Sequence, residues 1–186
     1  EIKFKFNKAF ETLKARGPDE YGIFENDQLL LGNTRLSIVS KEKINLPVQK
    51  HNCVISFNGE IFNYKEIRNE LIRNGYFFST DTDTEVIISA YDFYKQEFVK
   101  KLRGFFAICI YDDNKKSILL ARDRLGNKPL YYSYSNNKFI FSSTQYSLIN
   151  SQLISFEPNI EKFNEFIVFG DVTGIETLHK NIYELN

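Results

Sequence analysis

The sequence contains no methionine or tryptophan, only two cysteines, and no excess of either charge. Lys+Arg and Asp+Glu number 24 each, so the formal net charge at pH 7 is zero. This balance argues against the basic surface that nucleic-acid binding requires. No apolar run approaches the length of a membrane span, and no secretory signal is visible. We therefore expect neither a nucleic-acid nor a membrane partner, and a cytoplasmic location.

The cysteines and histidines are too few and too scattered for a disulfide framework or a metal site. Cys53 and Cys109 lie in apolar, strand-like segments, which is typical of buried core thiols. His51 and His179 stand in polar stretches without a partner at metal-ligand spacing. We interpret both histidines as solvated side chains, and the sequence predicts no metal site.

Length and composition are those of one soluble globular domain. The 186 residues are 42% hydrophobic and 26% charged, which is ordinary for a folded domain with its own core. The chain has no long linker and no internal repeat. We therefore predict one domain that spans residues 1–186.

Hydrophobic periodicity predicts a mixture of helices and strands. Helical spacing occurs at 2–13, from Asn63 to Asn74, from Thr82 to Tyr94, and at 144–150 and 158–169. Strand-like segments occupy 20–24, 28–32, 34–39, 53–57, 105–111, 117–122, 130–134 and 138–143, and 40–52 is a polar loop. This order predicts an α+β domain of packed layers. The near-continuous apolarity of 105–111 and of 117–121 predicts strands that are covered on both faces.

Two of the predicted helices begin with a capping-box pattern. Asn63 is followed three residues later by Glu66, and Thr82 is followed three residues later by Glu85. In such a box the first side chain accepts a hydrogen bond from a backbone N–H in the first turn of the helix. We therefore expect Asn63 and Thr82 to cap their helices.

Four polar positions are candidates for function, and each also has an ordinary structural explanation. Arg16–Asp19 reads as a turn between a helix and a strand. Arg35 lies in an apolar strand, where its guanidinium needs either a ligand carboxylate or an internal carboxylate. Asn58-Gly59 is a common hairpin turn, and Asp83 is a common helix cap. Taken singly, these positions leave both explanations open.

Taken together, the motifs resemble one family. The segments ARGPDEYG, GNTRLSIV, FNGEIFNYKEIR, TDTDTEVI, LRGFFAICIYD and ARDRLGNKPLYY occur in an order and spacing similar to those of the glutaminase domain of glutamine-hydrolysing asparagine synthetases. The resemblance covers essentially the whole chain, and FNGEIFNY and RDRLGNKPLYY are its most specific parts. It implies a class II glutamine amidotransferase with a four-layer αββα sandwich of the N-terminal-nucleophile hydrolase type, which agrees with the layered prediction.

The resemblance also implies roles for named residues. In that family an N-terminal cysteine attacks the side-chain amide of glutamine, with its own α-amino group as the base. Asn58, through its amide, and Gly59, through its N–H, would stabilise the oxyanion. Arg35 would bind the α-carboxylate of glutamine, and Asp83 with Glu60 would face its α-ammonium. The implied pocket is completed by main-chain groups of Leu36, Ser37, Ile38 and Val39.

This sequence departs from the family pattern in two places. Ala15 stands where the family usually has a histidine. Glu1 begins within the helix that should follow the nucleophile strand, so we expect the nucleophilic cysteine to be missing and this chain to be inactive. Cys53 and Cys109 lie within strands and have no free α-amine, so neither can replace it.

The resemblance further implies partners outside this chain. Ammonia would pass to a C-terminal synthetase domain in cis, which is absent from the 186 residues and would use ATP and Mg to convert aspartate to asparagine. No cofactor is expected in the glutaminase domain itself, and a homodimer is left open. Two alternatives stay open as well: a class II amidotransferase with another acceptor, and an inactive scaffold of the same fold. The joint presence of Arg35, Asn58, Gly59 and Asp83 argues against the scaffold.

Overall fold

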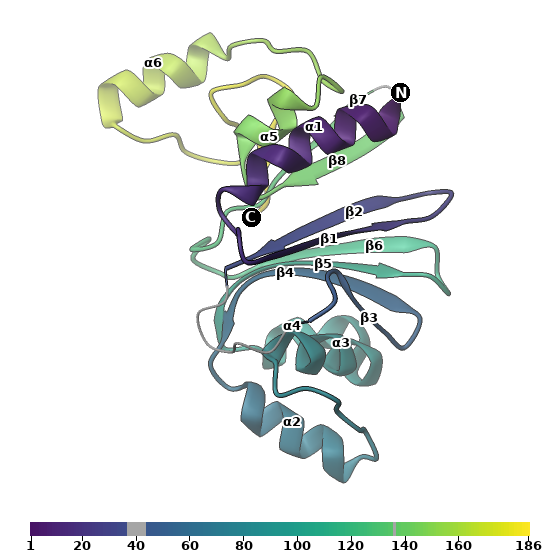
Figure 1. Cartoon of the computed structure of the whole chain (residues 1–186). Coiled ribbons are helices and arrows are strands. Elements are labelled where there is room, and N and C mark those ends of the chain that lie inside the picture. The colour runs from purple at the N-terminus through teal and green to yellow at the C-terminus, as the bar shows by residue number, and fades with distance from the viewer. Residues whose placement is uncertain (37–43, 136) are drawn as a thin grey trace. The chain divides into compact units, whose positions relative to one another are not determined.

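The computed structural model describes residues 1–36, 44–135 and 137–186. These residues form two compact units, one of residues 16–128 and one of residues 1–15 together with 129–186. Both units combine helices with antiparallel strands, so the predicted α+β class is confirmed (Figure 1).

The larger unit is built on a four-stranded antiparallel sheet of order β3-β4-β5-β6. Its strands are β3 (Val48–Lys50), β4 (Cys53–Ile61), β5 (Gly104–Asp112) and β6 (Ser117–Arg122). A ribbon of two strands, β1 (Glu20–Glu25) and β2 (Leu30–Arg35), packs on one face, and helices cover the other (Figure 1). β5 is therefore buried from Phe106 to Asp112, as its unbroken apolar sequence predicts. The same prediction for 117–121 is wrong, because β6 is the edge strand and only Ala121 in it is buried.

The helices below this sheet are α2 (Tyr64–Arg73), α3 (Asp83–Tyr94), the 3₁₀ turn η1 (Lys95–Glu97) and α4 (Phe98–Lys101). Thr82 caps α3 as predicted, because its hydroxyl accepts the N–H of Glu85 at 3.4 Å. The predicted side-chain cap at Asn63 is wrong. Asn63 precedes α2, but its amide donates to Lys101 O and its Oδ1 accepts the N–H of Arg103, both at 2.9 Å.

Two predictions about the early strands need correction. Thr34 and Arg35 do not open a separate strand at 34–39, because they continue β2 opposite β1; residues 37–39 lie outside the described residues. The predicted loop at 40–52 contains β3, which pairs with β4. The turn between β3 and β4 is His51-Asn52, with φ of 53° and 57°. Such a turn suits a hairpin, but without a glycine its sequence gives little sign of it.

The smaller unit pairs helices with a three-stranded sheet of order β8-β7-β9. Its elements are α1 (Ile2–Lys14), β7 (Tyr131–Ser135), β8 (Lys138–Ser142), α5 (Gln145–Asn150), α6 (Ile160–Phe169) and β9 (Tyr183–Glu184). The hydroxyls of Thr12 in α1 and Ser147 in α5 lie 2.7 Å apart, which holds these two helices together. All but β9 were predicted, and β9 is only two residues long.

The cysteines behave as predicted, and one histidine does not. Cys53 and Cys109 are free and buried, and burial raises the pKa of both thiols, that of Cys53 to about 11. His179 is half-buried and its Nδ1 has no hydrogen-bond partner among the described residues, so it is not a solvated side chain. The described ranges contain no helix long and apolar enough to cross a bilayer.

Candidate functional site

Asn58 and Gly59 lie inside strand β4 and not in a hairpin turn. Asn58 pairs with Ala107 of β5, Gly59 pairs with Phe106, and the ladder continues to Ile61 opposite Gly104. Because β5 is long and apolar, its pairing with β4 continues beyond Asn58-Gly59. The turn alternative for this segment is therefore wrong.

Gly59 occupies a position that no other residue fits. Its φ is 149°, and an added Cβ would lie 2.0 Å from the carbonyl oxygen of Phe105. Gly104 meets the same restriction from the other strand, because its Cβ would lie 2.1 Å from the carbonyl oxygen of Glu60. β4 and β5 therefore approach each other closely at this point, which fixes the backbone around the Gly59 N–H.

Asp123, which directly follows β6, holds the part of β5 that pairs with Gly59. Its carboxylate is buried and accepts the N–H of Phe106 at 3.1 Å, Asn127 at 3.1 Å and Lys128 at 3.2 Å. Burial alone would raise the pKa of Asp123, but these N–H donors outweigh it and hold the pKa below its ordinary value. The RDRLGNK motif is thus tied to the residue that faces Gly59 across the ladder.

Asp83 contacts the end of β4. It is the first residue of α3, and its Oδ2 accepts the N–H of Ile61 at 3.2 Å. Burial raises the pKa of Asp83, the hydrogen bond from Ile61 opposes this, and the negative charge of Glu60 adds to the increase. Thr82 supplies the N-cap of α3. The bond from Ile61 to Asp83 ties the start of α3 to the end of β4.

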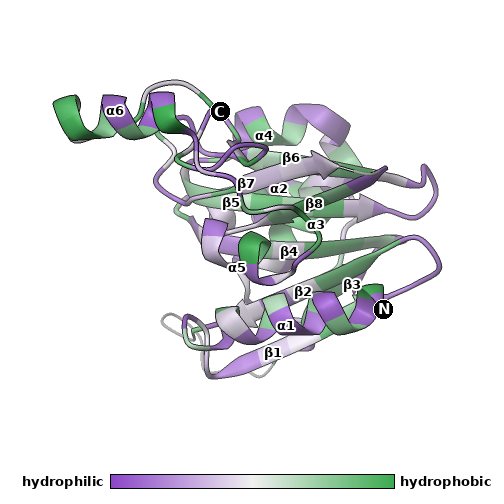
Figure 2. Ribbon diagram, turned by 90° about the horizontal axis from the view of Figure 1, so that it is seen from above, coloured by the Kyte–Doolittle hydropathy of each residue, from purple (hydrophilic) through white to green (hydrophobic). Residues whose placement is uncertain are grey.

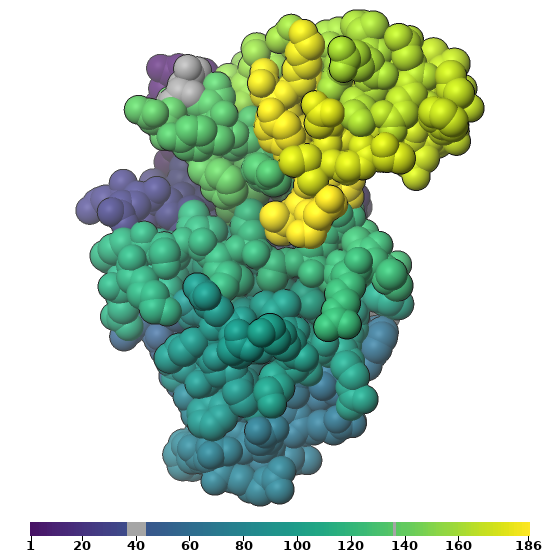
Figure 3. Space-filling view, turned by 180° about the vertical axis from the view of Figure 1, so that it is seen from behind, coloured from purple at the N-terminus to yellow at the C-terminus, as the bar shows by residue number. Residues whose placement is uncertain are grey.

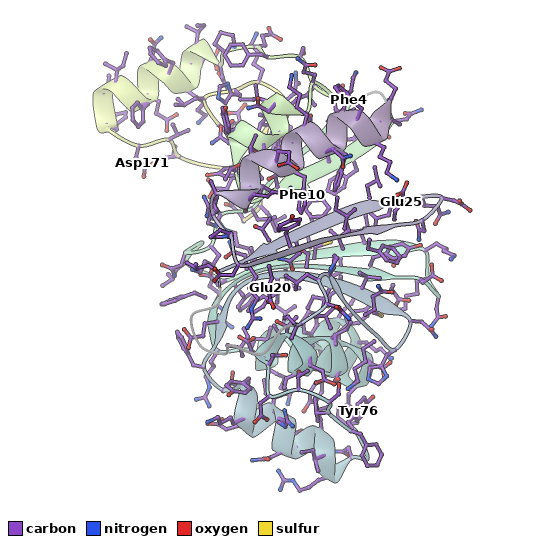
Figure 4. All side chains as sticks on the ribbon, viewed as in Figure 1. Phe4, Phe10, Glu20, Glu25, Tyr76 and Asp171 are labelled. Carbon is purple, nitrogen blue, oxygen red and sulfur yellow. The ribbon has the colours of Figure 1, made fainter. Side chains whose placement is uncertain are left out.

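Arg35 ends strand β2 and forms an internal ion pair. Its Nη1 lies 2.6 Å from Oε2 of Glu20, and the two side chains are only 19% and 16% exposed. Figure 4 labels Glu20, which lies directly across the ribbon from Arg35. The RGPD turn packs against the same residue. A Cβ on Gly17 would lie 2.5 Å from Arg35 N, and the N–H of Asp19 donates to Arg35 O at 3.2 Å.

Two contacts set the position of β2 against β4. The hydroxyl of Ser56 donates to Gly32 O at 3.3 Å, and the N–H of Phe57 donates to Oδ1 of Asn33 at 3.2 Å. These contacts place the middle of β2 against Ser56 and Phe57, the two residues that precede Asn58. Leu36 follows and is exposed, whereas Ser37, Ile38 and Val39 lie outside the described residues.

Glu85 is a central residue of this region that the sequence analysis did not single out as functional. Its side chain is 5% exposed, and its carboxylate accepts Nζ of Lys50 at 2.7 Å, the N–H of Thr80 at 2.7 Å and the N–H of Ser79 at 3.0 Å. Burial opposes ionisation, but these donors lower the pKa of Glu85 to about 2. The charged carboxylate therefore fixes the loop that leads into Asp83.

This loop lines a cavity of about 630 Å³. Lys50, Phe78, Thr82 and Glu85 are among its described lining residues, whereas Arg35, Asn58, Gly59 and Asp83 are not. This cavity is therefore not lined by the four candidate residues.

A family model described as the glutamine amidotransferase domain matches residues 1–186. The chain belongs to this family. The resemblance inferred from the motifs is thereby confirmed.

Two curated relatives of this amidotransferase domain are named as asparagine synthetases. Asparagine synthetase [glutamine-hydrolyzing] 1 of Bacillus subtilis is 40% identical over 90% of this chain and 27% of that protein. Putative asparagine synthetase [glutamine-hydrolyzing] 2 of Methanocaldococcus jannaschii is 33% identical over 99% of this chain and 40% of that protein. The chain thus spans less than half the length of either relative.

Solved structures show the same fold. A glutamine phosphoribosylpyrophosphate amidotransferase from B. subtilis, complexed with ADP and GMP, aligns with a TM-score of 0.64 over 78% of this chain and 40% of its own. At 16% identity the likeness concerns the fold alone.

Proposed function

We propose that this amidotransferase domain is the glutaminase domain of an asparagine synthetase. It would hydrolyse glutamine to glutamate and ammonia, and a synthetase domain of the same polypeptide would use the ammonia and ATP to convert aspartate to asparagine. The observation that carries the proposal is the arrangement around the end of β4, where Asp83 bonds to Ile61 N–H two residues beyond Gly59. The names of the relatives favour asparagine as the product over another acceptor or a scaffold.

The charges of Arg35 and Asp83 suit the α-carboxylate and the α-ammonium, which both lie at one end of glutamine. Arg35 would bind the α-carboxylate, and its partner Glu20 holds the guanidinium in place before substrate arrives. Asp83, with Glu60 beside it, would face the α-ammonium, whose positive charge favours the ionised form of Asp83. Main-chain groups of Leu36 to Val39 would complete the pocket.

Asn58 and Gly59 would supply two hydrogen-bond donors to an oxyanion. The Gly59 N–H is fixed by the close approach of β4 and β5. The Asn58 amide is half-buried and makes no hydrogen bond to any described residue, so it is free to donate. Both would act on the negative oxygen that forms when a thiolate attacks the side-chain amide of glutamine.

The nucleophile is proposed to lie outside the 186 residues. Cys53 and Cys109 are buried within strands and their thiol pKa values are raised, so neither supplies a thiolate near neutral pH. An N-terminal cysteine has its own α-amine as a base, with a pKa of about 7.7–8.0. Two free thiols also suit a reducing, cytoplasmic location.

The test uses the full-length protein with aspartate, ATP and Mg²⁺. We expect glutamate release from glutamine, and asparagine formation with either glutamine or ammonium salt as the nitrogen source. Glutamate release without asparagine would exclude the synthetase assignment but keep the glutaminase. Asparagine formation from ammonium alone, with no glutamate from glutamine, would identify an inactive scaffold.

A further inference from the structure

Helix α6 of the smaller unit exposes its apolar side chains to solvent. They are Ile160, Phe163, Phe166, Ile167, Val168 and Phe169, and we call them the α6 surface. Green, hydrophobic segments run along this helix in Figure 2, and Figure 3 shows the corresponding yellow-green atoms on the outside of their unit. An exposed apolar patch of this kind is typical of an interaction site.

The opposite side of α6 makes an ion pair and hydrogen bonds within the smaller unit. Lys162 and Glu165 are the half-buried residues of the helix, with side chains 15% and 20% exposed, and their Nζ and Oε2 lie 2.8 Å apart. Lys162 Nζ also donates to Thr173 O at 2.9 Å, and the N–H of Thr173 donates to Glu165 Oε1 at 2.7 Å. α6 therefore rests on polar contacts and presents its apolar side outward, the reverse of an ordinary surface helix.

The ends of α6 are well defined, so the exposed side is not a frayed segment. The Oδ1 of Asn159 accepts the N–H of Lys162 at 3.4 Å at the start. Gly170, with φ of 74°, ends the helix, and its N–H donates to Phe166 O at 2.8 Å. The apolar residues are thus presented on a fixed scaffold.

We infer that the α6 surface is the docking site of the synthetase domain of the same polypeptide. This inference rests on the proposed function. The curated relatives are much longer than this chain, which matches only 27% and 40% of their lengths. In a protein of that length, the additional domain would be a large partner in cis that covers the helix. A lipid surface fits less well, because membrane-surface helices carry mainly Lys and Arg on their polar side, whereas α6 also has Glu161 and Glu165 there.

The first test compares side-chain oxidation by hydroxyl radicals in the 186-residue chain and in the full-length protein. We expect strong labelling of Phe163, Phe166 and Phe169 in the short chain and loss of that labelling in the full-length protein. Phe4 on α1 is the internal reference, because it is 74% exposed and Phe169 is 75% exposed (Figure 4). Equal labelling of α6 in both proteins would overturn the inference. Protection that grows with concentration in the short chain would also overturn it, in favour of a second copy.

The second test asks whether docking matters for ammonia use. In the full-length protein, Phe169→Ser should lower the asparagine formed per glutamate released, whereas the matched Phe4→Ser should leave this ratio unchanged. An unchanged ratio in Phe169→Ser, together with unchanged labelling, would contradict the inference. The labelling experiment needs no enzymatic activity, so it gives an answer even if the full-length protein hydrolyses no glutamine.

Discussion

Gly59 combines two restrictions at a single residue: a positive φ and a close neighbouring strand. We predict that Gly59→Ala lowers the free energy of unfolding by about 3 kcal/mol or more, because the methyl group meets the Phe105 carbonyl and the backbone is strained. Urea unfolding monitored by circular dichroism measures this change.

The control for Gly59 is Gly75→Ala. Gly75 has a φ of +88° with open space around its Cβ position, so only the backbone strain of about 1 kcal/mol applies. If the two variants lose the same stability, the close approach of β4 and β5 is not what requires glycine at position 59.

Asp83 tests the proposed recognition of the glutamine α-ammonium. In the full-length enzyme, we predict that Asp83→Asn raises the KM for glutamine at least about 30-fold, because removing one partner of a desolvated charge pair costs about 2–5 kcal/mol. Synthesis from ammonium salt should be largely unchanged, since ammonia does not use this pocket. Steady-state kinetics with both nitrogen sources measures the effect. An equal loss with both would mean that Asp83 acts only through its bond to Ile61.

At the scale of elements, Glu85 links helix α3 to the loop that precedes it. The side chain was predicted as the second member of a capping box, but its carboxylate accepts from Ser79, Thr80 and Lys50. The helix start that carries Asp83 is thus fixed by a residue two positions further on.

We predict that Glu85→Gln destabilises the protein by about 1.5–3 kcal/mol at pH 7, through loss of hydrogen bonds to a charged group. The folded-state pKa of Glu85 is about 2, below its ordinary value of 4.5. Its stabilisation is therefore complete above about pH 4.5 and is lost as the pH falls towards 2. Urea unfolding of both proteins across this range should show a difference that shrinks with decreasing pH. A difference that does not depend on pH would show that the charge of Glu85 contributes nothing.

At the scale of the whole molecule, the fold of this domain does not require the nucleophile on which its proposed chemistry depends. We predict that the 186-residue chain releases no glutamate from glutamine above background, because Cys53 and Cys109 are buried and no other cysteine is present. A coupled glutamate dehydrogenase assay with the full-length protein as positive control checks this. Glutamate release that is abolished by Cys53→Ser or Cys109→Ser would show that an internal thiol is the nucleophile.

Local sequence was sufficient for most of the elements. Thr82 and the apolar period after it predicted α3 and its cap, and the unbroken apolar run at 105–111 predicted the buried strand β5. These features depend on side-chain spacing and on hydrogen bonds between residues close in the chain, which a sequence displays directly. The motifs also identified the family.

Tertiary structure decided the features that depend on partners far along the chain. Asn58-Gly59 has the sequence of a turn but lies in a strand, because β5 pairs with it throughout. Asn63 has the sequence of a cap, but its side chain bonds to Lys101 and Arg103. The sequence indicates that the Arg35 guanidinium needs an anionic partner. Only the pairing of β1 with β2 shows that this partner is Glu20. The polar underside of α6 likewise exists only because the loop at Thr173 folds back onto Lys162 and Glu165. A polar group can form an equally good hydrogen bond with a residue far along the chain or with one close in sequence. Only the fold determines which of these two partners lies near enough to bond.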